Sequence, residues 1–312
     1  MNALVVGYGS IGSRHARILK ELGCRTAVLS KRDINFQPHY RNLEEAIEKE
    51  SPEYVVVANA TNEHYETLTE LKKTKFKGFA LVEKPLFSKE EQFSPADFQQ
   101  LFVAYNLRFH PLLKRLRDIL RNEKVISAQC YVGQYLPEWR PSADYRQGYS
   151  ASKQQGGGSL RDLSHELDYL LWMLGPWTDI AAVGGHYSHL EIKTDDVFCI
   201  LMSTARCSAV TIQLNYLDRC TNREILVNTD RHTFKADLFR GLFQIDKEAP
   251  EQLQLERDLM YRLEHKAILD SSFEGLCTFD EGMQVLKMIA AIETSALKKK
   301  WITNRGVKVE DS

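Results

Sequence analysis

A glycine-rich turn near the start of the chain has the spacing of a phosphate-binding loop. Gly7, Gly9 and Gly12 form a Gly-x-Gly-x-x-Gly motif directly after the apolar run Ala3–Val6 and directly before a helical pattern. In that context the first glycine permits a tight turn, and the second lets the backbone approach a pyrophosphate. The third lets the helix pack against the strand, and the helix N-terminus stabilises the phosphate charge. We therefore predict a dinucleotide site formed by Gly7, Tyr8, Gly9, Ser10, Ile11 and Gly12.

The end of the second apolar run distinguishes the two nicotinamide dinucleotides. Sites for NAD usually carry an acidic residue there, about 20 residues after the glycines, which binds the ribose 2′-hydroxyl. This chain instead has Ser30, Lys31 and Arg32. These side chains could donate hydrogen bonds to a 2′-phosphate and neutralise its charge, so we expect NADP(H) to be preferred. Binding of NAD(H) is the alternative, with Asp33 as the ribose ligand.

A lysine follows a later apolar run, at a position that favours chemistry. Glu83-Lys84-Pro85 comes directly after Phe79–Val82, which places Lys84 at the carboxyl end of a predicted parallel strand. Open α/β sheets bind their ligands at that edge, and Pro85 restricts Lys84 to an extended backbone. A lysine held there could hydrogen-bond a substrate hydroxyl and help to remove its proton. The alternative is a solvated lysine at a strand end.

A second candidate for proton transfer lies in the segment from Gly156 to Asp168. The segment opens with three consecutive glycines, which permit close backbone approach to a ligand. Ser164 is a suitable N-cap for the helix that follows, and it places His165 in the first turn. A histidine there can act as general acid or base near neutral pH. Asp168 lies on the same helical face and could orient the ring. The alternative is a structural histidine.

The loop before these glycines is rich in aromatic and cationic side chains. Because it leads directly into the glycine segment, we expect it to border the substrate. Trp139 could pack against a sugar ring, and Arg140 or Arg146 could bind a phosphate or carboxylate. Ordinary surface ion pairs are the alternative. The predicted substrate residues in and after this loop are Trp139, Arg140, Tyr145, Arg146, Lys153 and Asp168.

Alternating strands and helices must position the nucleotide site. Short, continuous apolar runs alternate with helical patterns in the first third of the chain, as expected for a parallel sheet covered on both faces. The predicted strands are Ala3–Val6, Thr26–Leu29, Tyr54–Ala58, Phe79–Val82 and Leu101–Tyr105. The predicted helices are Ser13–Leu22, Leu43–Lys49 and Pro111–Leu120. We therefore predict an NADP-binding Rossmann domain over residues 1–121.

The rest of the chain has a different pattern. Several strands follow one another with few helices between them, which predicts a largely antiparallel sheet. The predicted strands are Ile126–Gln134, Ala181–His189, Val197–Ser203, Ala209–Tyr216, Ile225–Asn228 and Thr233–Leu238. The predicted helices are Ser164–Leu174, Leu255–Leu269 and Phe279–Leu297. The fold class is therefore α/β, with a doubly wound Rossmann sheet and a second α/β domain with a large open sheet over residues 122–312.

In order along the chain, these motifs resemble those of the Gfo/Idh/MocA family of oxidoreductases. The likeness rests on Gly7–Gly12, on Glu83-Lys84-Pro85 and on the segment from Gly156 to Asp168, and it covers essentially the whole chain. The segments Asn59–His64 and Tyr105–Pro111 also look like the family's. The style of the loop at residues 134–153 is similar to that of members from bacterial surface-sugar and nonulosonate pathways.

The resemblance implies roles for individual residues. Lys84, Asp162 and His165 would be catalytic, at an active site between the domains. Members often have one more residue between the aspartate and the histidine, which makes the part played by Asp162 the least certain. Arg108 would bind substrate. The cofactor residues implied besides the glycine turn are Asn59, Ala60, Thr61, His64, Glu83 and Lys84. The resemblance also implies a homodimer or homotetramer through the second sheet, and a cis Lys84-Pro85 bond.

Composition and charge exclude several other classes of protein. The chain has 312 residues, 43% of them hydrophobic and 27% charged, with a formal net charge of -1. This balance does not favour nucleic acid or an anionic membrane as a partner. The six cysteines are scattered without a Cys-x-x-Cys pair, so we predict no metal site. Free thiols, and strand-like sequence that begins at Ala3 without a leader, predict a cytoplasmic protein.

Together these features predict an NADP(H)-dependent oxidoreductase. It would transfer a hydride between nicotinamide C4 and a carbinol carbon of a sugar or sugar derivative that is anionic or nucleotide-activated. His165, assisted by Lys84, would exchange the hydroxyl proton. Two alternatives stay open. One is a hydrolase or lyase that retains its cofactor and uses transient oxidation, and the other is a non-catalytic, NADP-sensing regulator.

Overall fold

The computed structural model describes residues 1–140 and 143–306, and the chain divides into two compact units. The first unit comprises Met1–Phe109 and Asp258–Met283, and the second comprises His110–Arg257 and Gln284–Ser312. Residues 141–142 of the predicted substrate loop lie outside the described part of the chain. All six cysteines are free, with Cys199 and Cys220 exposed. Among the described residues, no helix combines the length and apolar character that a bilayer crossing requires.

The first unit contains the predicted parallel sheet. Its strand order is β15-β6-β5-β4-β1-β2-β3, and the pairings from β6 to β3 are parallel. The strands are β1 (Asn2–Val6), β2 (Arg25–Leu29), β3 (His39–Tyr40), β4 (Tyr54–Val57), β5 (Phe79–Val82), β6 (Gln100–Val103) and the antiparallel edge strand β15 (Cys277–Thr278). The chain crosses over from β3 to β4, beside β1, as in doubly wound folds.

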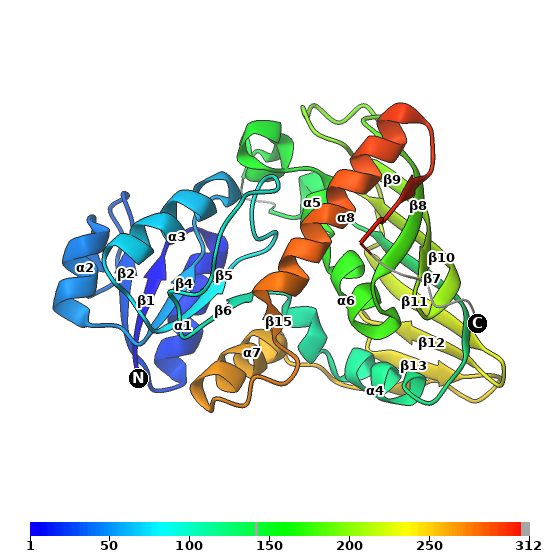
Figure 1. Cartoon of the computed structure of the whole chain (residues 1–312), viewed down its shortest axis with the longest axis horizontal. Helices are drawn as coiled ribbons and strands as arrows, with labels where there is room; N and C mark the ends of the chain where they lie inside the picture. The colour runs from blue at the N-terminus through cyan, green and yellow to red at the C-terminus, as the bar shows by residue number, and fades with distance from the viewer. Residues whose placement is uncertain (141–142, 307–312) are drawn as a thin grey trace. The chain divides into compact units, whose positions relative to one another are not determined.

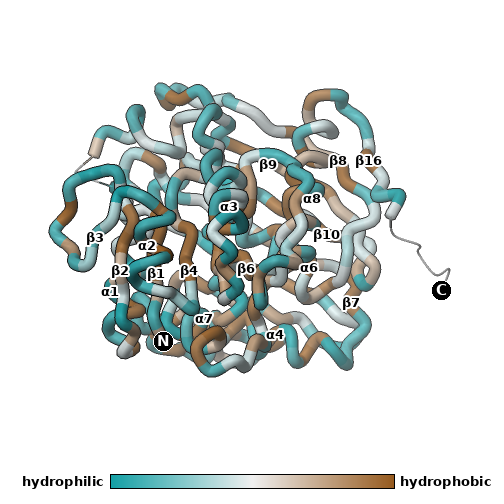
Figure 2. The backbone as a smooth tube through the Cα atoms, turned by 60° about the vertical axis from the view of Figure 1, so that its left-hand side comes forward, coloured by the Kyte–Doolittle hydropathy of each residue, from teal (hydrophilic) through white to brown (hydrophobic). Residues whose placement is uncertain are grey.

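Helices cover this sheet because its strands are apolar on both faces. Every residue of β4 and β5 is buried, and β1 and β4 are hydrophobic next to the more polar helices in Figure 2. The helices are α1 (Ser10–Glu21), α2 (Leu43–Glu50), α3 (His64–Lys73) and α7 (Leu259–Leu269), with short 3₁₀ turns η1 (Thr61–Glu63) and η2 (Asn106–Phe109). Helix α2 begins where Asn42 accepts a hydrogen bond from Glu45 N at 2.9 Å, as an N-cap does.

The second unit is built on a nine-stranded sheet. Its order is β14-β13-β12-β11-β7-β10-β9-β8-β16. The long central strands are β7 (Val125–Gly133), β8 (Trp177–Gly185), β9 (Val197–Thr204), β10 (Cys207–Asn215) and β11 (Asn222–Thr229). The outer strands are β12 (Thr233–Asp237), β13 (Leu242–Ile245), β14 (Glu251–Gln252) and β16 (Ile302–Thr303). Neighbouring strands are antiparallel apart from the parallel pair β7 and β10, so the prediction of a largely antiparallel sheet is confirmed.

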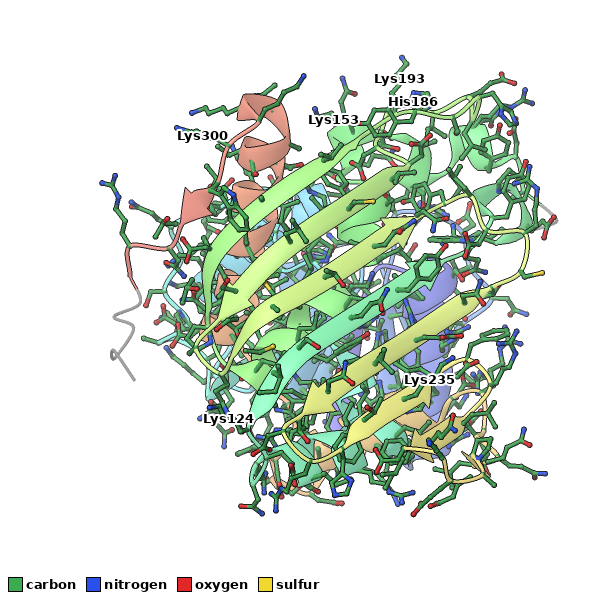
Figure 3. The ribbon with its side chains drawn as sticks, turned by 90° about the vertical axis from the view of Figure 1, so that its right-hand side faces the viewer. Lys124, Lys153, His186, Lys193, Lys235 and Lys300 are labelled. Atoms are coloured by element: carbon green, nitrogen blue, oxygen red, sulfur yellow. The ribbon has the colours of Figure 1, made fainter. Side chains whose placement is uncertain are left out.

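One face of this sheet is covered and the other is open (Figures 1 and 3). Helices α4 (Pro111–Leu120), α5 (Ser159–Asp162), α6 (His165–Leu174) and the C-terminal part of α8 (Phe279–Lys298) belong to this unit. Burial alternates along β9, where Ile200 is buried and its neighbour Leu201 is 52% exposed. The open face also exposes Val183, and this alternation is typical of a sheet with one solvated side.

The two compact units do not coincide with the two domains predicted from the sequence, which met at residues 121 and 122. Helix α4 packs on α6 and β12 in the second unit, whereas α7 packs on α1 and η2 in the first. Helix α7 also begins at Leu259, not at Leu255. The amphipathic pattern shows that each helix has an apolar face, but it does not show which sheet that face covers.

Candidate active site

The glycine turn has the geometry that a pyrophosphate requires. Helix α1 begins after Gly9, without a side-chain cap or an acidic residue in its first turn. A Cβ on Gly12 would lie 2.0 Å from Gly7 O, which shows how closely the helix approaches the turn. At Gly9, by contrast, a Cβ would meet nothing within 4 Å. The turn therefore presents backbone N–H groups and the positive end of a helix to an open space, which fits a phosphate.

The loop after β4 lies against this turn. A Cβ on Gly7, whose φ is +96°, would lie 2.6 Å from Asn59 N, so the two backbones touch. The Asn59 side chain donates to Thr67 at 2.9 Å, while its Oδ1 is buried without a hydrogen-bond partner among the described residues. A buried amide oxygen usually has a donor, so this atom fits a ligand such as a nicotinamide carboxamide. Ala60 and the buried Thr61 follow as the start of η1.

The His64 side chain is buried and contacts the backbone of two loops. It is 1% exposed, and burial lowers the pKa of its imidazole, so the ring is neutral. Nδ1 lies 3.0 Å from Leu86 O, and Nε2 lies 3.3 Å from Asn59 O. Because a neutral ring has a single N–H, His64 donates to one of these two carbonyls and packs against the other, between the loop after β4 and the segment after Pro85. The prediction that His64 contacts the cofactor is replaced by one in which it positions Asn59.

Cations gather at the end of β2. Ser30 is buried, and its hydroxyl accepts a hydrogen bond from Arg32 N at 3.2 Å, which shapes the turn that carries Lys31 and Arg32. Both of these side chains are exposed. Asp33 is 94% exposed and pairs with Arg41, which follows β3. The sequence pattern did not single out Arg41, because its proximity to Asp33 depends on the pairing of β2 with β3.

Lys84 and His165 lie in different units. Lys84 is half-buried after β5, its backbone N–H donates to Glu83 Oε2 at 3.1 Å, and the Lys84-Pro85 bond is cis as the resemblance implied. In the second unit, His165 is the first residue of α6 and is half-buried. Asp168 is buried one turn further along that helix at 1% exposure, which argues against a role in binding substrate.

Asp162 ends the short helix α5 and so does not share a helix with His165. Its Oδ2 accepts hydrogen bonds from Ser150 Oγ at 2.5 Å and from Tyr216 OH at 2.6 Å. Burial and Asp162 together raise the pKa of Tyr216, so its phenol stays protonated and donates. Asp162 thus ties the loop at Ser150 to the end of β10. Neither hydroxyl was foreseen, since their proximity depends on the tertiary fold.

In the predicted substrate loop, Arg146 forms ion pairs with acidic side chains, and other cations are exposed. Arg146 pairs with Asp144 at 2.8 Å and with Glu191 at 3.4 Å, and the Tyr145 hydroxyl lies 3.4 Å from Glu191 N. Arg140 and Lys153 are exposed. The sequence pattern did not single out Lys193. Its loop is joined to the loop that carries Lys153 by a hydrogen bond from Lys193 N to Ala151 O at 3.1 Å (Figure 3).

Two further predicted residues, Trp139 and Arg108, contact other side chains of their own units. The Trp139 ring lies edge-on to Tyr216, with centroids 5.2 Å apart, which places it next to the Asp162 cluster. Arg108 is 2% exposed, and its guanidinium contacts Glu281 at 3.0 Å and the Leu276 carbonyl at 3.3 Å. This burial corrects the prediction that Arg108 binds substrate, because the ion pair holds it inside the first unit.

Comparisons with known proteins bear on the family and on the fold. Residues 114–235 match the family model described as the GFO/IDH/MocA C-terminal domain. An uncharacterized oxidoreductase of Synechocystis is 27% identical over 171 residues, which are 52% of this chain and 45% of that protein, so the match spans less than half of the relative.

Solved structures share the fold over nearly the whole chain. Levoglucosan dehydrogenase in complex with NADH has a TM-score of 0.82 at 16% identity and covers 97% of this chain and 98% of its own. GenD2 from gentamicin A biosynthesis, in complex with NAD, has a TM-score of 0.79 at 18% identity, covering 98% and 96%. WlbA dehydrogenase from Bordetella pertussis, with NADH and UDP-GlcNAcA, has a TM-score of 0.75 at 17% identity, covering 97% and 98%. At these identities the likeness shows a common fold.

Proposed function

We propose that the chain is a sugar oxidoreductase that uses NADP(H), on the premise that residues 114–235 match the model of the GFO/IDH/MocA C-terminal domain. It transfers a hydride between nicotinamide C4 and a carbinol carbon of a sugar or sugar derivative. The observation that carries the proposal is the combination, in one unit, of the uncapped start of α1, the open space at Gly9 and the unpartnered Asn59 Oδ1.

The preference for NADP(H) rests on the cations after β2 and β3. Lys31 and Arg32 are exposed, and Arg41 pairs with the acidic residue nearest to the site, Asp33. A 2′-phosphate carries negative charge that these guanidinium and ammonium groups can bind and neutralise. The structural neighbours are described with NAD or NADH, so the preference is a proposal about this chain's own residues.

Each proposed catalytic residue has a defined task. When bound, the nicotinamide supplies a hydride acceptor or donor. His165 accepts the proton of the substrate hydroxyl in the oxidative direction and returns it in the reductive direction. Lys84 donates a hydrogen bond to the same hydroxyl. Asp162 keeps the loop at Ser150 in place, and Trp139 packs on the sugar ring.

An anionic or nucleotide-activated sugar is the substrate class that the second unit favours. Arg140, Lys153 and Lys193 are exposed cations on and beside the loop that leads into Gly156. One neighbour of the same fold is described with UDP-GlcNAcA and another with levoglucosan. Both ligands are sugars, and the first carries a diphosphate and a carboxylate, which the exposed cations would recognise.

A cytoplasmic homodimer or homotetramer completes the proposal. The six free cysteines suit a reducing compartment. The open face of the second sheet exposes Val183 at 66% and Leu201 at 52%, and such an apolar surface is typical of an interface. Light scattering coupled to gel filtration would measure the mass, and a monomer would contradict this part.

The test is a titration of the purified protein with NADPH and NADH, followed by nicotinamide fluorescence. Tighter binding of NADPH, with turnover of an acidic or nucleotide-activated sugar in a subsequent panel, would support the proposal. Equal or tighter binding of NADH would contradict the NADP(H) preference and indicate that Asp33 binds the ribose. A nucleotide that survives purification, with activity that needs no added cofactor, would favour the cofactor-retaining hydrolase or lyase.

A further inference from the structure

A row of four polar side chains, three of them completely buried and the fourth partly buried, leads to Lys84 through the first unit. Tyr54 OH lies 2.9 Å from His265 Nδ1, and His265 Nε2 lies 2.8 Å from His15 Nδ1. His15 Nε2 then lies 2.8 Å from Glu83 Oε1. Tyr54, His15 and His265 are completely buried, and they come from β4, α1 and α7. The row therefore depends on the tertiary fold of this unit.

The chemistry of the two ends sets the direction of every hydrogen bond in the row. Burial raises the pKa of Glu83, but the hydrogen bonds from His15 and the Lys84 backbone and the charge of Lys84 outweigh it and leave the pKa below its ordinary value, so Glu83 is a carboxylate that can only accept. It accepts from His15 Nε2–H, which leaves His15 Nδ1 as the acceptor for His265 Nε2–H. His265 Nδ1 is then the acceptor for the Tyr54 hydroxyl. Burial supports this arrangement, because it raises the pKa of Tyr54 and lowers that of His265.

This arrangement keeps His15 neutral. A proton added to its Nδ1 would oppose the His265 N–H across a 2.8 Å contact. The other charged or titratable groups near this row, among the described residues, include Tyr261, whose ring lies edge-on to His15 at 5.4 Å, and Arg14 next to Tyr261. Glu264 and Cys24 lie near its other end, where both act on Tyr54. A neutral His15 gives Glu83 a hydrogen bond without cancelling its negative charge. An imidazolium in the same place would form a neutral pair with it.

Glu83 connects the row to Lys84. One carboxylate oxygen accepts from His15, and the other accepts from the Lys84 backbone N–H at 3.1 Å. The Glu83 backbone N–H continues the ladder of the sheet to Val57 O at 2.9 Å. The carboxylate is therefore fixed on both sides: it holds the peptide of Lys84, and its charge interacts with that of the Lys84 side chain, which lowers the pKa of Glu83.

We propose that His15 and His265 are positioning residues for Lys84, acting through Glu83. Tyr54 fixes the tautomer of His265, His265 fixes the tautomer of His15, and His15 fixes the rotamer of Glu83. The catalytic consequence rests on the proposed function, in which Lys84 hydrogen-bonds the substrate hydroxyl. The row should therefore affect kcat more than it affects the binding of the sugar or of the nucleotide.

The first arm of the test is independent of activity. The ¹⁵N-labelled wild-type chain is studied by long-range ¹H–¹⁵N NMR, with His15→Gln and His265→Gln used to assign the two rings. We expect both rings to be neutral, each with a protonated Nε2 and a pyridine-like Nδ1. Tyr54→Phe should change the ¹⁵N shifts of His265 more than those of His15, because Tyr54 contacts His265 directly. A doubly protonated His15, or a proton on Nδ1 of either ring in the wild type, would overturn the proposed row.

The second arm separates positioning from mere structural support. A Gln at position 15 can still donate to Glu83 and accept from His265 through its amide, whereas Leu can do neither. We expect His15→Leu and His265→Leu to lower kcat about tenfold or more, with KM for the sugar and Kd for NADPH within about twofold. His15→Gln should recover most of kcat. Equal losses in Gln and Leu, or losses confined to KM or Kd, would overturn the positioning role.

The two arms also distinguish this proposal from the proposed function. If the wild-type chain binds NADPH but turns over no sugar, the proposed function fails, and the row is then judged by the tautomers alone. If the Leu variants do not fold, the wild-type spectrum and the His15→Gln kinetics still decide the outcome.

Discussion

The Tyr216 hydroxyl lies 2.6 Å from Asp162 Oδ2, an oxygen that also accepts from Ser150. The strand β10, the short helix α5 and the loop at Ser150 are thus joined at one carboxylate oxygen. Because this oxygen already has two donors, Asp162 is better suited to holding the loop than to exchanging a proton. The short spacing between Asp162 and His165 therefore reflects two separate helices with different tasks.

Tyr216→Phe should destabilise the chain by about 2 kcal/mol, since a part-buried carboxylate loses a donor. It should also raise KM for the sugar more than it lowers kcat, because Asp162, which accepts from Ser150 in the loop, loses the second donor that holds it in place. Urea unfolding and steady-state kinetics measure both quantities. The matched control is Tyr131→Phe. It removes a similar hydrogen bond, the 2.9 Å contact from Tyr131 OH to Asp218, which does not involve the Gly156–Asp168 segment. Equal effects of the two changes on KM would contradict the assignment.

His165→Ala should abolish most turnover and leave nucleotide binding intact. Loss of a general acid or base typically costs about 10²–10⁴ in rate. His165 belongs to the second unit, whereas the glycine turn and Asn59 belong to the first, so Kd for NADPH should stay within about twofold. Stopped-flow or steady-state kinetics and a fluorescence titration provide the two numbers. Unchanged turnover would remove His165 from its proposed task.

Two glycine substitutions should separate stability from nucleotide binding. Gly12→Ala places a Cβ 2.0 Å from Gly7 O and should cost about 1–3 kcal/mol or more in unfolding free energy. Gly9→Ala meets nothing within 4 Å, at a φ of -82° that alanine tolerates. It should fold normally but weaken NADPH binding about tenfold or more, because its methyl group occupies the approach of the pyrophosphate. Unaltered NADPH affinity in folded Gly9→Ala protein would place the phosphate elsewhere.

The double change Lys31→Ala and Arg32→Ala should weaken NADPH binding about 10- to 100-fold and leave NADH binding nearly unchanged. The reason is that each lost charge-assisted hydrogen bond to the 2′-phosphate is worth about 1.5–3 kcal/mol, partly offset by solvent exposure. Arg25→Ala is the control, since Arg25 begins the same strand at its opposite end and is 67% exposed. Parallel losses for both nucleotides would argue that the cations bind another part of the cofactor.

The strands of the first unit could be predicted because each is a short, continuous apolar run. Phe79–Val82 agrees with β5 at both ends, and Tyr54–Ala58 exceeds β4 by a single residue. Helix Pro111–Leu120 was also placed correctly, as α4. Its membership in the second unit was not, because periodicity identifies an apolar face and not its partner.

Residues that act through distant partners could not be predicted. His15 and His265 are 250 positions apart and in direct contact, and neither sits in a local pattern that indicates the other. The family resemblance implied that Arg108 binds substrate, but Glu281 compensates its charge inside the first unit, and no local pattern indicates that contact. The 3₁₀ turns η3 (Leu136–Glu138), η4 (Tyr145–Gln147), η5 (Tyr149–Ala151) and η6 (Lys153–Gln155) lack the apolar periodicity from which longer elements are recognised.

Stability should fall as the pH decreases from about 6.5 towards 4, and His110 should account for part of that fall. Burial lowers the pKa of His110 from 6.5 to about 4, although its hydrogen bond to Leu238 O at 3.2 Å opposes the shift. Its Nδ1 accepts the N-terminal hydrogen bond of α4 from Leu112 N at 3.2 Å, so a proton at Nδ1 would face another N–H. In the unfolded chain the imidazole protonates near 6.5.

The sign follows from proton uptake. Between about pH 6.5 and 4 the unfolded state binds more protons at His110 than the folded state does, so the contribution of this residue is complete above 6.5 and is lost as pH falls through that window. The full difference is about 3 kcal/mol. His110→Asn keeps a capping side chain but cannot titrate. Urea unfolding at several pH values should therefore show a weaker pH dependence for the variant. His64 and His265 titrate in both proteins and cancel in the difference, so parallel curves would show that His110 keeps an ordinary pKa.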